Sequence, residues 1–556
     1  MCIAQPFEPR QNLHSDRLID VRGNQLSLVL TKDFQPRDAG SHRYIALTYC
    51  WGPEPHASKQ LKTTRDNISQ YLRQIPESSL PQVIKDAVAV TRALSIPFLW
   101  VDALCILQDD VSDWEHQCDV MEQIYGNAYT AVAAVSSQNC EEGFIKRKDR
   151  LLFPFRNESG DTRVFGIYPP PNQADTQQEV PQSPWIKRGW TFQERIAATR
   201  ILMFSKGSLH FDCKDFSNTQ GRDEKVDRDY YYIMLDRETI DSGETAAIYQ
   251  QWSKLMAQIK PKAHQLTRKT DFLPSIGGIA SLFSKKLDDD YAAGLWKESM
   301  HQSLYWALST TGKPSLQDLL KALKTPSPYI APSWSWASRN EPFRFDLYHP
   351  DLSADCRREY HTIDTAITLR GESVFGEIKD AALDITSKLY VGSPRLTYEK
   401  LSGRFQNEKD LVRFDGRYFA DIQSDCVCQD IFEPRPGNIL VAPISFLLIG
   451  STIRRKRDAE GPSSKRWKFS YYYCTPSDAA NTGPKSESSS TLPVSAGSGG
   501  DLEAETLSKR AAYGLLIHPT ENPNEYYRLG TFFSQPEFAG GLSFFDNVEV
   551  STVKLV

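Results

Sequence analysis

Residues that suit ligand binding follow two apolar segments near the start of the sequence. Tyr49, Trp51 and Gly52 come at the end of the first segment, and Asp102 and Gln108 lie in and just after the second. Gly52 would let a ligand approach the backbone closely, and Trp51 offers a face on which a planar ring can stack. A carboxylate such as Asp102 can stabilise an oxocarbenium-like transition state, as the cleavage of a glycosidic bond requires. Such chemistry would suit a nicotinamide–ribose bond.

A second candidate carboxylate lies further along the chain. Glu194 follows Gln193 in a polar run next to Trp190, and this run could line a cleft with Asp102 after folding. The alternative for Glu194 is an internal ion pair that ties its segment to the sheet. For Asp102 the alternative is a structural hydrogen bond to a neighbouring loop or to Arg188, because a carboxylate in an apolar segment must find a partner or stay protonated.

The composition excludes several classes of protein. The 556 residues contain 65 Lys and Arg against 70 Asp and Glu, a formal net charge of −5, so no basic excess exists to neutralise nucleic acid. An aromatic content of 11% rules out a wholly disordered chain. Neither CxxC, HxH nor HxxxH spacing occurs, and GxSxG and HExxH are absent, so we expect no metal site. No stretch approaches the ~18 apolar residues of a membrane span, and we expect a cytoplasmic protein.

The elements that must position these residues alternate in type. Segments 44–49, 98–107 and 129–135 have the apolar pattern of buried strands, and segments 81–95 and 112–125 have helical periodicity. The order β-α-β-α-β predicts a mainly parallel sheet with helices on its faces. In such a sheet the carboxyl ends of the strands meet at one edge, where ligands bind.

The second of these helices begins with the pattern of a capping box. Ser112 would be the N-cap, and Glu115 would reach back to its backbone. Glu115 is also the obvious candidate for a catalytic carboxylate in this helix. Both interpretations are open at this point.

The remaining sequence predicts two further regions. Residues 245–325 look mostly helical, including the periodic stretch 295–308, and the pattern turns strand-like from residue 362. Residues 476–505 are rich in Ser, Gly and Pro and indicate a flexible loop within the strand-rich part. The candidate strands of that part are 363–369, 439–442, 445–449 and 513–518.

Three blocks of the sequence resemble the fungal heterokaryon-incompatibility (HET) domain. They are Tyr44–Gly52, Leu99–Gln108 and Arg188–Arg195, and the spaced Trp114, Met121 and Tyr125 resemble the helix after the second block. Further blocks resemble the region that often follows in that family, at 272–278, 291–296 and 331–338.

The resemblance implies a fungal protein of nonself recognition between fused hyphae, whose relatives trigger growth arrest or cell death. It also implies a domain distantly similar to TIR domains, some of which hydrolyse NAD while others act as assembly modules. In TIR-type hydrolases a catalytic Glu lies a few residues past a Trp; here Gln117 and Cys118 follow Trp114 at the nearest offsets.

We therefore expect an α/β fold with a TIR-like parallel sheet flanked by helices, followed by a helical region and a β-rich C-terminal domain. The expected boundaries are 1–41 for an N-terminal extension, 42–200 for the HET domain, 201–340 for the helical region and 341–556 for the β-rich part. The leading hypothesis is an effector that works mainly through association with a protein partner or with itself, without a cofactor. The alternative is an enzyme that uses the same cleft, either an NAD glycohydrolase, with NAD as substrate, or a tailoring enzyme of a fungal secondary-metabolite pathway.

Overall fold

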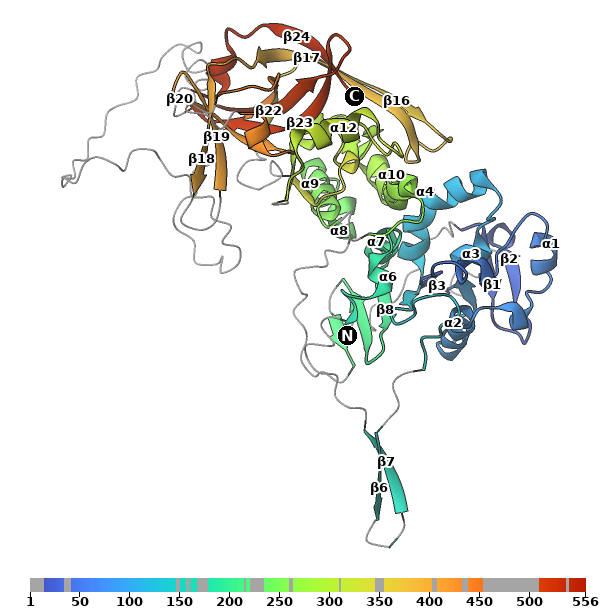
Figure 1. Cartoon of the computed structure of the whole chain (residues 1–556). Coiled ribbons are helices and arrows are strands. Elements are labelled where there is room, and N and C mark those ends of the chain that lie inside the picture. Colours follow the sequence, from blue (N-terminus) through green and yellow to red (C-terminus); the bar gives the residue numbers. More distant parts are fainter. Residues whose placement is uncertain are drawn as a thin grey trace, which may run out of the picture. The chain divides into compact units, whose positions relative to one another are not determined.

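Contacts divide the chain into two units (Figure 1). The first comprises Met1–Glu298, Ser327–Pro342 and Ile367–Ala381, and the second comprises Ser299–Pro326, Phe343–Ala366 and Ala382–Val556. The computed structural model describes residues 15–34, 42–146, 151–156, 160, 162–167, 179–214, 217–220, 235–259, 264–309, 312–345, 355–402, 408–432, 439–453, 510–536 and 540–556. The loop expected at 476–505 lies outside the described residues.

The first unit is built on an eight-stranded sheet with the order β10-β9-β8-β5-β3-β4-β1-β2. Its four central strands, β8, β5, β3 and β4, are parallel, whereas the strands on both sides pair antiparallel. The prediction of a mainly parallel sheet is thus confirmed for its centre. The strands are β1 (Arg17–Asp20), β2 (Ser27–Leu30), β3 (Tyr44–Thr48), β4 (Phe98–Trp100), β5 (Thr130–Ala133), β8 (Arg200–Phe204), β9 (Leu209–Cys213) and β10 (Ser217–Thr219).

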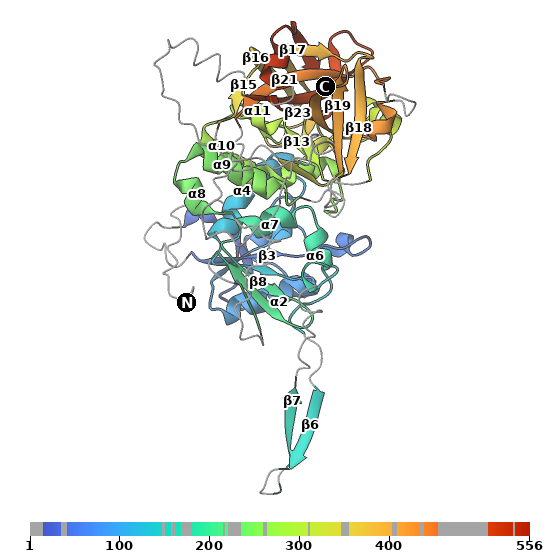
Figure 2. The same ribbon diagram turned by 90° about the vertical axis from the view of Figure 1, so that its left-hand side faces the viewer.

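The order in which successive strands are added to the sheet reverses at β3. From β3 it passes through α2 (Gln82–Ala93) to β4 on one side, and it then returns through α4 (Val111–Asn127) to β5 on the other side. Figure 2 shows α2 and α4 on opposite faces of the sheet. The register pairs Ile45 with both Leu99 and Thr130, so the three strand ends lie side by side, as predicted. This reversal is the topological switch point at which open α/β sheets bind ligands.

The second apolar segment leaves the sheet earlier than predicted. The strand expected over 98–107 ends at Trp100, and Asp102 begins the short helix α3 (Asp102–Cys105). The Asp102 carboxylate accepts a hydrogen bond of 2.7 Å from the backbone N–H of Ala103, which favours the helical turn. The prediction was wrong because a buried helical turn and a buried strand have the same continuous apolar pattern.

The capping box predicted for α4 is also wrong. The N-cap is Asp110, whose carboxylate accepts from the backbone N–H groups of Ser112 and Asp113. Ser112 is instead inside the first turn, so Glu115 is not a capping residue. The charged carboxylate of Asp110 caps the helix two residues earlier, so the helix begins before Ser112.

Helices cover the remaining faces of the first unit, and two small strand pairs complete it. The stretch 295–308, predicted as helical, forms β12, α11 and β13 instead, because most of its apolar side chains are buried and a run of buried residues is compatible with short strands as well as with a helix. The helices not yet named are α1 (Ile68–Tyr71), α6 (Pro184–Lys187), α7 (Thr191–Ala197), α8 (Arg237–Asp241), α9 (Thr245–Met256) and α10 (Gly277–Leu287). The strand pairs are β6 (Leu151–Arg156) with β7 (Thr162–Ile167) and β11 (Tyr291–Ala292) with β12 (Leu295–Trp296).

The second unit is β-rich, as predicted, and is organised around a ten-stranded sheet. The expected strands at 363–369, 445–449 and 513–518 are present, whereas 439–442 makes only isolated bridges at Ile439 and Leu440. The sheet contains β15 (Arg357–Arg358), β16 (Thr362–Leu369), β17 (Ile378–Val391), β18 (Leu396–Ser402), β19 (Glu408–Phe414), β20 (Arg417–Ser424), β21 (Ser445–Thr452), β22 (Ala511–Pro519), β23 (Glu525–Ser534) and β24 (Val550–Leu555). The unit also has α11 (Met300–Ser303), α12 (Leu316–Lys324) and the pair β13 (Trp306–Leu308) and β14 (Phe343–Phe345).

Among the described residues, no helix combines the length and the apolar character needed to cross a membrane.

Candidate functional site

Asp102 lies where β4 ends, and its carboxylate is held by neighbouring groups. The indole Nε1 of Trp51 donates to Oδ2 at 3.0 Å, and the backbone N–H of Ala103 donates to Oδ1 at 2.7 Å. Burial raises the pKa of Asp102, and the nearby Arg188 guanidinium opposes the rise. The side chain stays half-buried, so a carboxylate of increased basicity remains within reach of solvent.

The Tyr49 hydroxyl lies close to the same carboxylate inside the domain. Tyr49 is only 1% exposed, and among the described residues its hydroxyl has no hydrogen-bond partner of good geometry. Burial, and then the negative charge of Asp102, raise the pKa of Tyr49 well above its ordinary value. A buried hydroxyl without a partner has a free-energy cost, so this group is available to a ligand or to a small rearrangement toward Asp102.

Glu194 lies in α7 and is bound to the end of β3. Its Oε2 accepts from the Thr48 hydroxyl and from Arg188 Nη1 at 3.3 Å, and Arg188 Nη2 donates to Oε1 at 3.5 Å. The indole Nε1 of Trp185 donates to the same Thr48 hydroxyl at 2.6 Å. Glu194 therefore forms an internal ion pair with Arg188 and is also tied to the sheet.

Arg188 serves both carboxylates. Burial acts against its charge, but Glu194 and Asp102 together raise the pKa of the guanidinium above its ordinary value. Burial raises the pKa of Glu194 and Arg188 again opposes the rise. One cation thus keeps two buried or half-buried carboxylates together at the ends of β3 and β4. We call Thr48, Tyr49, Trp51, Asp102, Arg188 and Glu194 the carboxylate cluster.

The other predicted ligand-binding residues surround the carboxylate cluster with structural contacts. The Gln108 amide donates to the backbone carbonyl of Asp102 at 3.1 Å, and the Lys62 ammonium lies 5.1 Å from the ring centre of Trp51. Trp190 packs edge-on against Trp114, with ring centres 5.9 Å apart. These contacts fix the geometry of the cluster without excluding a ligand from Trp51.

Gly52 is required by the packing of the chain itself. Its φ of +87° is unfavourable for other residues, and an added Cβ would lie 2.3 Å from the Cβ of Asn139. Asn139 belongs to the loop after β5, so Gly52 lets the loops after β3 and β5 approach each other. The close approach to the Gly52 backbone, which was predicted for a ligand, is thus made by Asn139 of the protein itself.

The structure does not join Glu115 to the carboxylate cluster. Its Oε2 accepts from the backbone N–H of Glu372 at 3.1 Å, on the loop between β16 and β17. This contact was not visible in the sequence, because residues 115 and 372 are remote along the chain and no local pattern joins them. Thr48, Trp185 and Lys62 also belong to the site without having been singled out as candidates.

Comparison with known proteins agrees with the three blocks that meet in the carboxylate cluster. Residues 44–194 match the family described as heterokaryon incompatibility protein (HET). This segment is therefore similar to a HET domain, and we refer to it by that name below. No curated protein and no solved structure matches the chain.

The carboxylate cluster contains residues from all three blocks of the HET domain and connects them. Thr48 and Trp51 come from the first block, Asp102 from the second, and Arg188 and Glu194 from the third. Hydrogen bonds connect the first block to the second through Trp51 and Asp102, and to the third through Thr48 and Glu194, which are 146 residues apart. The presence of the domain links the chain to heterokaryon incompatibility.

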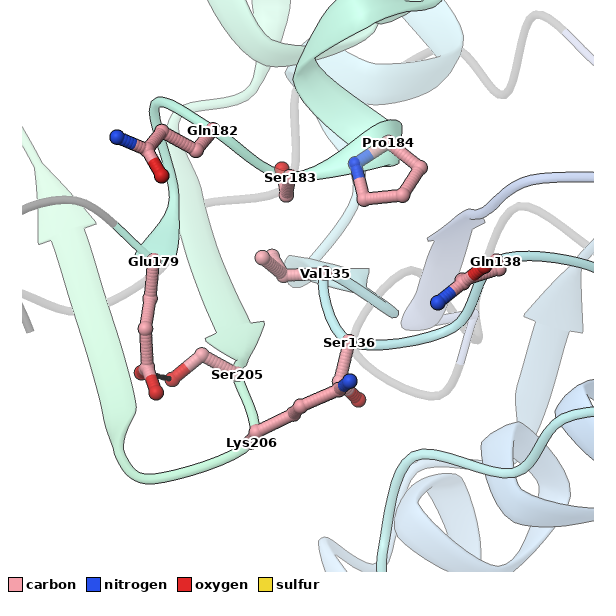
Figure 3. Close-up of a pocket in the computed structure, with 9 residues that line it drawn as sticks. All are labelled: Val135, Ser136, Gln138, Glu179, Gln182, Ser183, Pro184, Ser205 and Lys206. Atoms are coloured by element: carbon pink, nitrogen blue, oxygen red, sulfur yellow. Dashed lines mark hydrogen bonds between the residues drawn. The ribbon is translucent and has the colours of Figure 1, made fainter. Parts of the chain in front are cut away.

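A pocket opens at the same edge of the HET domain sheet, at the ends of β5 and β8 (Figure 3). Its volume is about 310 Å³, at the lower end of the range for small-molecule sites. Val135 and Ser136 follow β5, and Ser205 and Lys206 follow β8. The pocket and the carboxylate cluster therefore occupy neighbouring strand ends of one sheet.

Proposed function

We propose that this chain acts in fungal nonself recognition as a cytoplasmic effector of growth arrest or cell death, mainly through protein association. The observation that carries the proposal is the convergence of the three HET blocks on one cluster whose charges are largely satisfied by each other. Glu194 has only 5% of its side chain exposed, and Arg188 only 21%. Such groups favour a role in holding a signalling-competent shape that a protein partner, or a second copy, recognises.

Controlled expression of the full chain in a fungal host tests this proposal. We expect the wild-type chain to slow growth, and Trp51→Ala to relieve the arrest, because it removes the hydrogen bond to Asp102 and the contact with Lys62. Growth rate at equal protein level is the measurement. Leu94→Ala, which truncates an apolar side chain that is 43% exposed, is the matched control and should leave the arrest unchanged. Normal growth with abundant wild-type protein would contradict the proposal.

A second candidate function is hydrolysis of a glycosidic bond, with NAD as the substrate. Two groups favour it: the half-buried Asp102 carboxylate, whose ionised form Arg188 favours against burial, and the Tyr49 hydroxyl close beside it. The strand order β4-β3-β5-β8 places both at a topological switch point, as a TIR-like domain would require. In this function Asp102 stabilises the oxocarbenium-like ribose, and Trp51 stacks on the planar ring. A tailoring enzyme of secondary metabolism would use the same carboxylate on another substrate.

Purified protein incubated with NAD tests the second candidate. We expect nicotinamide release, and a fall of at least about 100-fold in its rate for Asp102→Asn, because the amide lacks the charge that stabilises the transition state. Chromatographic quantification of nicotinamide is the measurement. Asp66→Asn, at an exposed acidic residue, should retain the wild-type rate. Absence of turnover at high protein concentration would eliminate the hydrolase and leave the association proposal standing.

A further inference from the structure

A serine in the pocket is connected to a carboxylate and an imidazole. Ser205 lies in the turn between β8 and β9, and its Oγ donates to Glu179 Oε2 at 2.5 Å (Figure 3). His210 Nε2 lies 3.1 Å from the same Oγ, and His210 Nδ1 lies 3.0 Å from the Thr219 hydroxyl. Hydrogen bonds thus link the Ser205 hydroxyl, a candidate nucleophile, to the Glu179 carboxylate, a candidate base. They also link it to the His210 ring, which Thr219 orients.

The Ser205 hydroxyl has two acceptors for its one proton. They are Glu179 Oε2 at 2.5 Å and the backbone carbonyl of Ser208 at 2.8 Å, and the reaction considered below uses the arrangement in which the proton points to the carboxylate. In this arrangement the Ser205 Oγ accepts from the backbone N–H of Ser208 at 3.1 Å, and the His210 tautomer that carries its proton on Nε2 donates to the same Oγ. Thr219 then donates to His210 Nδ1. The two N–H donors would stabilise negative charge that develops on the Ser205 oxygen, and the carboxylate is placed to take its proton.

The pocket exposes this hydroxyl to a small molecule. Ser205 itself is only 3% exposed, but it lines a pocket of about 310 Å³ together with Glu179 and Lys206. Val135 and Pro184 supply apolar surface on the same pocket, which suits a short acyl chain. Lys206 also lines this pocket and adds a positive charge to it.

We propose that Ser205 is the nucleophile of a second site in the HET domain, which hydrolyses small esters with Glu179 as the general base. The proposal assigns an activity to groups that the carboxylate cluster does not use. No known sequence motif marks this site, because it is the pairing of β8 with β9 that brings Ser205 and His210 together.

The reaction balances without a cofactor. Glu179 takes the Ser205 proton as Oγ forms a bond to the ester carbonyl carbon, and the electron pair of the carbonyl bond moves to the carbonyl oxygen. The bond to the alcohol oxygen then breaks, and the alcohol leaves with the proton from Glu179. In the second half, Glu179 takes a proton from water, the hydroxide attacks the acyl-serine, and Ser205 leaves with that proton. The products are a carboxylic acid and an alcohol.

Labelling of the full-length protein with a fluorophosphonate probe, followed by mass spectrometry of the peptides, tests the proposal. We expect the label on Ser205, together with hydrolysis of p-nitrophenyl acetate. Ser205→Ala should abolish both. Glu179→Gln should lower both rates by at least about 100-fold, because the amide cannot take the proton.

The matched control is Ser112→Ala, which removes an exposed hydroxyl on α4 and should leave labelling and hydrolysis unchanged. Ser205 also closes its turn through the Ser208 backbone, so the thermal midpoint of each variant is measured alongside. Glu179→Gln keeps a hydrogen-bond acceptor for Ser205, so a lower rate in a variant with an unchanged thermal midpoint reports on proton transfer and not on folding. Label on another residue, no label on the wild-type chain, or an unchanged rate in a folded Glu179→Gln variant would overturn the proposal.

Discussion

Arg188→Met should lower the free energy of unfolding of the HET domain by about 3 kcal/mol, because it leaves the Glu194 carboxylate buried without its cation. Arg188 faces Glu194 at 3.3 Å, and the side chain of Glu194 is only 5% exposed. Met keeps much of the length and apolar volume of the Arg stem, so the loss reports on the charge more than on packing. Chemical denaturation followed by tryptophan fluorescence measures it, since Trp185 and Trp51 belong to the same site.

The loss should depend on pH. Burial raises the pKa of Glu194 and of Asp102, and Arg188 limits both rises, so both pKa values increase further in the variant. A carboxyl group whose pKa is higher in the folded state binds its proton more tightly there, so stability falls as the pH rises from the unfolded pKa toward the folded one. The deficit of Arg188→Met should therefore be small near about pH 4, around the unfolded values, and grow toward neutral pH.

Arg65→Met is the matched control for this experiment. Arg65 also pairs with a carboxylate, that of Asp110 at 2.7 Å, but its side chain is 66% exposed. Its loss should leave the stability close to that of the wild-type protein, because water replaces an exposed partner. Equal effects of the two substitutions, or a deficit of Arg188→Met that is independent of pH, would show that the carboxylate cluster does not depend on its cation.

Arg528→Met should lower the free energy of unfolding of the β-rich second unit by about 3–5 kcal/mol. Arg528 and Asp425 pair at 2.7 Å with side-chain exposures of 0% and 1%. The guanidinium also lies 3.4 Å from the ring centre of Trp306 and donates to the backbone carbonyl of that residue. The substitution removes all three interactions and leaves the Asp425 charge in the core.

Hydrogen exchange of the full-length protein measures this second effect locally. We expect faster exchange in β20 and β23, which carry the backbone on both sides of the pair. Arg395→Met is the control, because Arg395 pairs with Asp415 while its side chain is 61% exposed. It should cost less than about 1 kcal/mol. Unchanged exchange in β20 and β23 for Arg528→Met would refute the importance of the buried pair.

The centre of the first sheet could be predicted because its strands and helices have clear patterns. The segments at 44–49 and 129–135 differ from the observed strands by one or two residues at their ends. The outer strands could not be predicted, since β1 and β2 are only four residues long and β10 only three. Short segments do not establish a period, and their place in a sheet is decided by partners that are distant in the sequence.

The site could be predicted only in part, for a related reason. The rule on strand ends leads to Tyr49, Trp51 and Asp102, and a polar run in an apolar region leads to Glu194. What no local pattern contains is the ion pair of Arg188 with Glu194, the electrostatic influence of Arg188 on Asp102, or the link between Ser205 and Glu179. Such contacts depend on the register of strands and on the course of loops, which are properties of the folded chain.

The shared guanidinium of Arg188 has an evolutionary consequence. Because two acids depend on one base, a change at position 188 alone is expected to be selected against, whereas loss of either acid alone leaves the base with a remaining counter-ion. Lineages that have lost Arg188 should therefore first have replaced both Asp102 and Glu194 by uncharged residues. Aligned relatives with an uncharged residue at 188 should carry amides or apolar side chains at 102 and 194, and the order of replacement along their tree should place the acids first.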